Sequence, residues 1–213
     1  MTPRHRSRSV RAERRERELA LRRSDVLAAA SRVFAEKGFS DARVAEIAAA
    51  SELSLASVYS MFKGKEELYQ EVITTTADSM REAVQRKVEA VPDPAERLLA
   101  LVDALFAGFE ENRMLLRMYA RGTQGLPWKI RQAMGESALH IFQQFTAWVV
   151  GLVRKAKRAG HLPGLDPESV ALSLIGTATT TAAHWIETTP DRPLTEAAPL
   201  VRALLERVLR GPR

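Results

Sequence analysis

The feature that most constrains this chain is a short stretch, residues 53–66, with the signals of a two-turn helix. Ser54 occupies the position expected for an N-cap, and Leu53 and Val58 have the spacing of a hydrophobic staple. Gly64 marks the end of the pattern. A helix of two turns is not stable by itself in water. The sequence therefore predicts that other helices pack around it.

Two amphipathic runs directly upstream are candidates for these neighbours. Only residues 50–53 separate the second run from the two-turn helix, which is the spacing of a helix-turn-helix whose second helix enters a DNA major groove. By pattern alone, an ordinary helical bundle remains an open alternative. The apolar positions are Val26, Leu27, Ala30, Val33 and Phe34 in the first run, and Val44, Ile47 and Ala48 in the second.

The identities of the residues favour the DNA-binding interpretation. About fifty residues, without a gap, resemble the N-terminal DNA-binding domain of the TetR family of transcriptional regulators. The resemblance includes a Tyr-x-x-Phe-x-x-Lys-Glu spacing in its last part. The matching segments are Phe34-Ala35-Glu36-Lys37-Gly38-Phe39, Val44-Ala45-Glu46-Ile47-Ala48, Ser54 to Tyr59, and Phe62-Lys63-Gly64-Lys65-Glu66-Glu67-Leu68.

Position in the motif and the resemblance together indicate eight candidate DNA-binding residues. Hydroxyls and free N–H groups at the start of the recognition helix can reach phosphate oxygens. The resemblance implies backbone contacts for Tyr59 and Lys65, although the Tyr59 ring can also pack in the core. For Phe62 we expect packing alone. The candidates are Ser54 and Ser57 at the helix start, Leu55, Ala56 and Ser60 facing the groove, Tyr59, Lys65 and Arg43.

Two departures from the family pattern affect the local prediction. Ala42 and Arg43 replace two threonines, so we expect the helix that follows to be capped from Ser40 or Asp41. Glu52 occupies a turn position that is often glycine. It either adopts a left-handed conformation, at a cost of ~1 kcal/mol, or the turn differs. These departures leave the operator sequence undetermined.

Positive charge is concentrated at the N-terminus. Residues 1–23 contain nine arginines and three glutamates, whereas residues 24–70 have a net charge of −2. We expect residues 1–22 to form a basic, disordered arm, in which residues 11–22 can extend the first helix. Beside a DNA-binding domain, such an arm is expected to follow phosphates or enter the minor groove. The alternative is a solvated tail that only aids solubility.

Composition excludes several other classes. The chain has no cysteine and no long apolar run, so we expect a cytoplasmic protein without disulfides or a membrane partner. It contains no phosphate-binding glycine loop and no His-Glu-x-x-His motif. The four histidines lack a metal-ligand spacing. The sequence thus predicts a protein that is not an enzyme and that has neither a cofactor nor a metal site.

The rest of the chain is predicted to be helical, which makes an all-α protein of about nine helices. A fourth helix should run from Lys65 to about Val91, and one long helix should follow Pro127 and end before Gly160. We expect a helix-turn-helix DNA-binding domain over residues 23–71 and a larger ligand-binding and dimerisation bundle over residues 72–213.

Aromatic and methionine side chains gather in the middle of the larger domain. They predict either an apolar pocket between helices or ordinary core packing. The resemblance implies a small-molecule effector there, and the composition favours a lipophilic one. The candidate ligand-binding residues are Phe106, Phe109, Met114, Met118, Trp128, Phe142, Phe145 and Trp148.

The last two helices carry small residues over 176–183 and a broad apolar stripe over 200–209. The resemblance implies that they pair with a second copy, and a two-fold dimer requires a palindromic operator. The predicted function is a repressor that leaves double-stranded DNA when its effector binds. Three alternatives remain: an activator, a regulator that needs its ligand as corepressor, and a helical carrier or enzyme that retains a degenerate helix-turn-helix.

Overall fold

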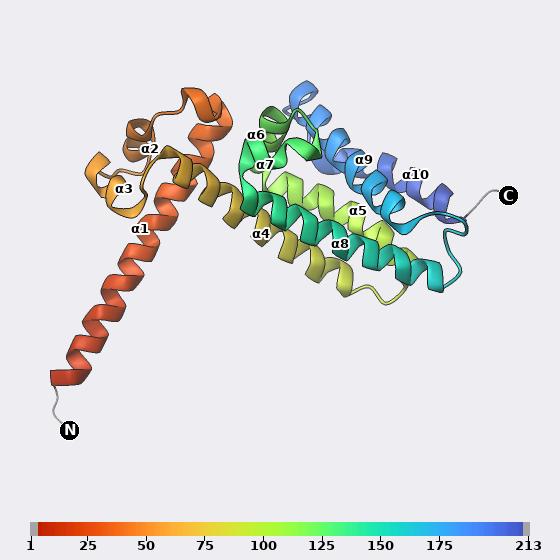
Figure 1. Cartoon of the computed structure of the whole chain (residues 1–213), viewed down its shortest axis with the longest axis horizontal. Helices are drawn as coiled ribbons and strands as arrows, with labels where there is room; N and C mark the ends of the chain where they lie inside the picture. The colour runs from red at the N-terminus through yellow and green to blue at the C-terminus, as the bar shows by residue number, and fades with distance from the viewer. Residues whose placement is uncertain (1–3, 211–213) are drawn as a thin grey trace. The chain divides into compact units, whose positions relative to one another are not determined.

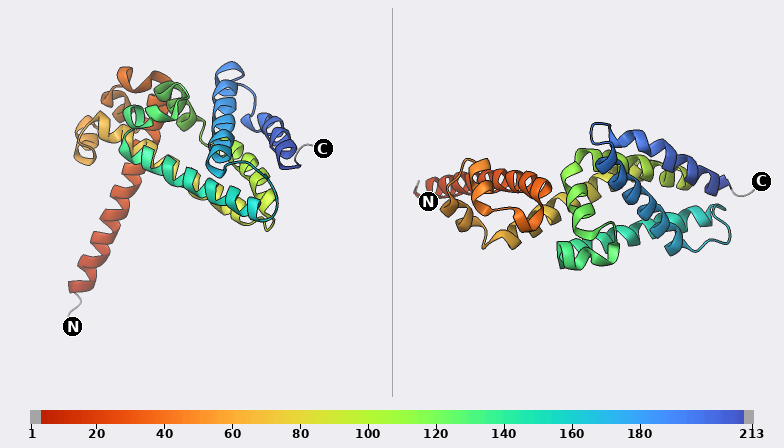
Figure 2. Two further views of the ribbon diagram at one scale, coloured as in Figure 1. Left: turned by 45° about the vertical axis from the view of Figure 1, so that its right-hand side comes forward. Right: turned by 90° about the horizontal axis from the view of Figure 1, so that it is seen from above.

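The computed structural model describes residues 4–210 and, of these, the side chains of residues 11–209. Ten α-helices and two 3-10 helices occur in this part of the chain, without a β-strand, which confirms the predicted all-helical fold. Figures 1 and 2 show the helices in chain order. No described helix is both long and apolar enough to cross a membrane. The chain forms two compact units, residues 1–72 and 73–213.

The first unit consists of α1 (Arg4–Asp41), α2 (Val44–Ala50), α3 (Leu55–Met61) and the first two turns of α4 (Lys65–Glu89). Its core is formed by one apolar face of α1 against α2, α3 and α4. Gly38 interrupts α1 near its end with a φ of 75°, which turns the chain toward α2. The largest fully buried side chains are Phe34, Ile47, Phe62 and Leu68.

The N-terminal arm differs from the predicted disorder. Helix α1 begins at Arg4, so residues 4–22 are helical, while residues 1–3 lie outside the described residues. The arm is rich in Arg, Glu, Leu and Ala, which are good helix formers. Arg14 and Glu18 add an i,i+4 ion pair with 3.1 Å between nitrogen and oxygen. Since the packed part of α1 already provides the nucleus, extending the helix costs little.

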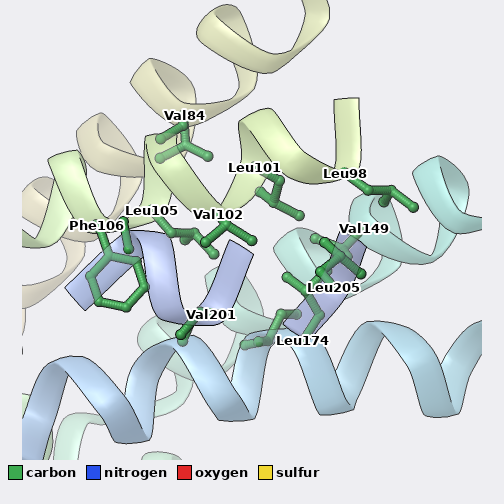
Figure 3. Packing of buried hydrophobic residues seen from close by; sticks show 14 of the residues in the cluster. Val84, Leu98, Leu101, Val102, Leu105, Phe106, Val149, Leu174, Val201 and Leu205 are labelled. Atoms are coloured by element: carbon green, nitrogen blue, oxygen red, sulfur yellow. The ribbon is translucent and has the colours of Figure 1, made fainter. Parts of the chain in front are cut away.

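The second unit is a bundle built around α5, whose apolar residues face several other helices. Figure 3 shows Leu101, Val102 and Leu105 of α5 with Val201 and Leu205 of α10. Helix α5 also packs on α8 and α9. The elements are the rest of α4, α5 (Pro94–Glu111), α6 (Arg113–Thr123), η1 (Pro127–Lys129), α7 (Ile130–Met134), α8 (Glu136–Arg158), α9 (Pro167–Thr188), η2 (Leu194–Ala197) and α10 (Ala198–Arg210).

The single long helix predicted after Pro127 is broken at Gly135. This residue has φ 92° and ψ 172°, so η1 and α7 form a separate arm that folds back on α8. Only glycine adopts such a backbone conformation readily. Periodicity alone could not show the break, because the apolar spacing continues on both sides of it. The break at Gly135 explains why the described residues contain ten α-helices, one more than the predicted nine.

Candidate functional site

The connection between α2 and α3 is a tight left-handed turn. Glu52 has a φ of 56°, so the first of the two predicted alternatives holds. The backbone N–H of Leu53 donates to the carbonyl of Ala48 at 3.0 Å, which closes the end of α2. The hydroxyl of Ser54 accepts from the N–H of Ser57 at 3.1 Å, which confirms the predicted N-cap. These bonds set the direction in which α3 leaves α2.

Helix α3 has one buried and one exposed face. Val58 is fully buried, and Phe62 just after the helix is buried in the same core, as predicted. Burial of each such side chain contributes about 1.5–3 kcal/mol, which is enough to hold a seven-residue helix in place. The outer face carries the predicted groove-facing residues Leu55, Ala56 and Ser60 together with Tyr59, and all four are exposed. A duplex could therefore approach this face without disturbing the core.

Charged side chains cap the start of α2. Arg43, not Ser40 or Asp41, is the N-cap residue, and its backbone N–H donates to the Glu46 carboxylate at 3.3 Å. Arginine has no side-chain acceptor, so Glu46 supplies the bond from within the helix. A hydrogen bond from Lys37 holds the pKa of Glu46 below its ordinary value. The side chain of Arg43, a candidate DNA contact from the sequence, is exposed.

Arg23 ties the beginning of the packed part of α1 to α3 and α4. Its guanidinium donates to the Met61 carbonyl at 2.6 Å and to both carboxylate oxygens of Glu71. It also stacks on the Phe62 ring, with 4.1 Å between the guanidinium carbon and the ring centroid. Sequence reasoning counted Arg23 only among the basic residues of the arm. Nothing in the spacing indicated that it lies beside the C-terminal end of α3.

Lys65 has two partners that the sequence did not indicate. Its ammonium donates to the carbonyls of Ser40 and Ala42 at 3.0 and 3.1 Å, and lies 4.6 Å from the Phe39 ring centroid. These contacts satisfy carbonyls at the end of α1. A lysine ammonium has three N–H donors, so a phosphate contact would use the third.

The second unit contains a partly open, apolar cavity of about 150 Å³. Helix α4 supplies five lining residues, and α5 to α9 supply the remainder. On α4 they recur every three or four residues, at positions 73, 77, 80 and 84, so its inner face is one wall of the cavity. The lining residues are Ile73, Ala77, Met80, Arg81, Val84, Leu105, Phe109, Leu115, Leu116, Tyr119, Ile130, Met134, Ala138, Ile141, Phe142, Phe145, Ile175 and Thr179.

Few polar groups border the cavity, and most of them are engaged. The Arg81 guanidinium is bonded to Asp78 at 2.6 Å and to Gln85 at 2.8 Å. The Thr179 hydroxyl donates to the carbonyl of Ile175 at 2.7 Å. Burial raises the pKa of the Tyr119 hydroxyl, which therefore stays neutral at neutral pH. The cavity thus suits an uncharged, largely apolar group.

Comparison with known proteins finds a family match within the first unit. The sequence profile of the bacterial regulatory proteins of the TetR family matches residues 26–72, the segment that contains α2, α3 and the packed part of α1. Residues 26–72 form a TetR-family DNA-binding domain. The chain is a DNA-binding transcriptional regulator.

Similarity to known regulators extends beyond the matched segment. The repressor KstR2 of Mycobacterium tuberculosis is 28% identical over 174 residues, which cover 82% of this chain and 84% of that protein. The activator FasR of Mycolicibacterium smegmatis is 33% identical over 97 residues, covering 46% and 44% of the two chains. The structure of FadR from Bacillus subtilis in complex with stearoyl-CoA superimposes with a TM-score of 0.73 at 19% identity, over 89% of this chain and 99% of FadR.

The cavity of this protein brings together only part of the predicted ligand-binding set. Phe109, Phe142 and Phe145 line it. Of the other five residues, none lines the cavity: Phe106 and Met118 are buried elsewhere in the bundle, Met114 is partly buried, Trp128 is 76% exposed, and the Trp148 ring nitrogen donates to Glu89 at 3.2 Å.

The lining residues of α4 and α7 were missed. Their apolar spacing was visible, but the sequence does not show which face of a buried helix borders empty space.

Proposed function

We propose that this protein is a homodimeric repressor that leaves a palindromic operator when a small lipophilic molecule enters the cavity of the second unit. The observation that carries this proposal is the double role of α4. Its first two turns belong to the first unit, and its next three turns line the cavity. A molecule that displaces α4 in the cavity acts on the helix that also supports α3.

The small volume of the cavity supports a displacement of α4 by the effector. About 150 Å³ is the volume of an apolar cavity that holds a molecule the size of benzene, whereas pockets for larger ligands measure roughly 300–1,000 Å³. An effector with a long apolar chain must therefore enlarge the site. Met80 of α4 and Met134 of α7 line the cavity and have flexible side chains that allow this. The rigid helix behind Met80 then shifts with it.

We propose that the effector belongs to the class of lipophilic acyl compounds. The lining is nearly all aliphatic and aromatic, which fits an acyl chain and excludes a free charge. FadR, which shares the fold, was crystallised with stearoyl-CoA.

DNA recognition is proposed to use the exposed face of α3 and its surroundings. Leu55, Ala56 and Ser60 would face base edges and methyl groups in the major groove. The remaining candidates would contact phosphates, which fixes the position of α3 on the duplex. These are Arg43, Ser54, Ser57, Tyr59 and Lys65.

Dimerisation is proposed to use α9 and α10. Helix α10 exposes Leu200, Leu204 and Val208 at spacings of four residues, and α9 exposes Leu172. Small residues of α9, including Gly176 and Thr180, leave room for a helix to approach closely. Exposed apolar side chains on two adjacent helices are typical of a protein interface. A two-fold axis through it would present two copies of α3 to one palindromic site.

Binding to DNA fragments from upstream of the chain's own gene tests the regulator proposal. With excess nonspecific competitor, we expect a shifted complex containing one dimer, weaker at the higher of two salt concentrations. Added stearoyl-CoA or a shorter acyl thioester should release the DNA. A carrier or enzyme that retains a degenerate helix-turn-helix would show no specific, salt-dependent complex at either salt. Tighter binding with the thioester would contradict release and favour a corepressor.

Distance measurement tests the mechanism. Because the chain has no cysteine, Lys63→Cys provides one labelling site per protomer at an exposed position just after α3. Spin labels on the two protomers report the separation of the recognition helices. We expect this distance to change when the effector is added. If the effector releases the DNA fully while this distance stays unchanged, the proposed displacement of α4 is contradicted. The proposed class of effector would not be affected.

A further inference from the structure

We propose that the exposed helical arm, residues 11–22 of α1, is a rigid phosphate-binding extension whose arginines follow the DNA backbone next to the groove occupied by α3. The inference rests on the proposed binding of α3 to DNA. It goes further by assigning a second DNA-binding element with a fixed orientation.

The orientation follows from helical register. Arg11, Arg15 and Arg22 are separated by four and seven residues, so they share one face of α1. The next residue on that face is Val26, four positions after Arg22, and Val26 is fully buried in the core of the first unit. Val33 follows after another seven residues and is also buried. The arginine face of the arm therefore continues the buried face of α1, which packs on α2.

The helix is continuous over this whole length. Non-helical dihedrals within α1 occur only at Gly38, beyond Val33. All residues from 11 to 22 are exposed, so nothing in the described part of the chain covers the arginine face. Glu18 also lies near this face, but it is paired with Arg14. Figure 1 shows the arm continuing straight out of the first unit.

Arg23 places the base of the arm beside the recognition helix. Its bond to the Met61 carbonyl joins α1 to the C-terminal end of α3. A helix that continues past this point presents its inner face to the space bordered by α3, where a bound duplex would continue. Residues 11–22 span about 18 Å at 1.5 Å per residue, and phosphates repeat about every 1.7 Å along a duplex when both strands are counted.

The charge balance favours DNA as the occupant of this face. Residues 24–70 have a net charge of −2, so the body of the first unit contributes little electrostatic attraction. Nonspecific affinity comes mainly from cations that neutralise phosphates. The helical state also decides between the two contacts that the sequence left open. An α-helix with side chains is about 10–12 Å wide and the minor groove about 6 Å; the arm therefore lies on the backbone.

Two insertions test the orientation without changing any charge. Two alanines inserted between Ala20 and Leu21 turn Arg11 and Arg15 by about 200° relative to Val26, whereas four alanines turn them by about 40°. The probe is a mixed-sequence duplex, with affinity measured against salt concentration. The two-residue insertion turns Arg11 and Arg15 away from the inner face and brings Arg17 onto it, a net loss of one arginine over residues 11–22. We expect it to lower the slope of log affinity against log salt by about 0.9. The four-residue insertion should stay close to the unmodified chain.

A matched pair of substitutions gives an independent reading. Arg15→Gln removes a cation from the inner face, and Arg17→Gln removes one from the opposite face two residues later; glutamine preserves helix propensity. We expect the slope to fall by about 0.9 for Arg15→Gln and by clearly less for Arg17→Gln. Circular dichroism should show equal helicity for the two variants.

Equal effects of the two insertions and of the two substitutions would overturn the oriented helix and show a flexible basic tail. Unchanged slopes in all variants would overturn any contact between the arm and DNA. The operator proposal is tested separately. If the unmodified chain binds no specific operator but the variants still differ on mixed-sequence duplex, the operator proposal is rejected and the proposal for the arm is retained.

Discussion

At the scale of single residues, strain and capping around α3 give the first prediction. Glu52 is held at a φ of 56°, which costs a residue with a side chain roughly 1–2 kcal/mol. Glycine adopts this conformation freely, but it raises the conformational entropy of the unfolded chain, which lowers the stability by about 0.4–1 kcal/mol. Glu52→Gly should therefore stabilise the α2–α3 motif by about 0.5–1 kcal/mol.

Hydrogen exchange of amides in α2 and α3 measures this stabilisation, because it reports the opening of that motif by itself. Glu52→Ala is the control and should bring no gain, since alanine keeps the strain. Slower exchange in both variants would show that the glutamate charge, and not the backbone, is the source of the effect.

Asp166 gives a second residue-scale prediction, on pH. Its carboxylate accepts the N–H of Ser169 at 2.8 Å at the start of α9, and this bond holds its pKa below the ordinary value of 3.8. A depressed folded pKa means that the stabilisation is present above the unfolded pKa. It is lost as the pH falls below about 3.8 through the folded pKa. Asp166→Asn retains an N-cap side chain without this titration.

The measurement is unfolding of the second unit against pH, followed by tryptophan fluorescence, because Trp128, Trp148 and Trp185 all lie in that unit. We expect the stability difference between the native chain and Asp166→Asn to be constant from neutral pH down to about pH 5. Below pH 4 the native chain should lose its advantage. Parallel curves over the whole range would mean that Asp166 does not titrate differently in the folded state.

At the scale of elements, a larger side chain on α8 can fill the cavity. Ala138 lines the cavity and is 7% exposed, so Ala138→Phe should occupy much of the space available to an effector. We expect at least a tenfold loss of acyl-thioester affinity, with DNA affinity unchanged. Overpacking should cost no more than about 1–3 kcal/mol of stability.

Titration of the thioester by calorimetry checks this expectation. Ala159→Phe, at an exposed position just after α8, is the control with the same change of side chain. Full effector affinity in Ala138→Phe would place the effector elsewhere in the molecule and remove the cavity from the proposal.

At the scale of the whole molecule, the exposed stripe of α10 makes dimerisation testable. Leu200 is 63% and Leu204 is 52% exposed on a helix that otherwise packs on α5. Replacing both with glutamate would bring four like charges together in a two-fold interface. We expect a monomer in sedimentation and at least a tenfold loss of operator affinity, because both half-sites must be occupied by one assembly.

Trp128→Glu is the matched control, since it removes an exposed apolar side chain outside the last two helices. It should leave both the dimer and the operator complex intact. A stable dimer in the double glutamate variant would exclude α10 from the interface.

The features that could be predicted from the amino-acid sequence are local ones. The cap at Ser54, the left-handed option at Glu52 and the buried Phe62 depend on a few neighbouring residues, and so does the all-helical pattern. The family resemblance rested on the same segment. Predictions failed where a local signal was weak: a single glycine at 135 was enough to break the helix expected after Pro127.

Tertiary structure alone decided which residues meet. Phe109 and Trp128 are both aromatic, yet one lines a cavity and the other is exposed. Arg23 and Arg22 are neighbours in a basic run, but only Arg23 turns toward Glu71 and Met61. The physical reason is that cavity walls and ion pairs depend on the relative positions of helices distant in sequence. Periodicity identifies the apolar side of a helix, and packing decides what that side contacts.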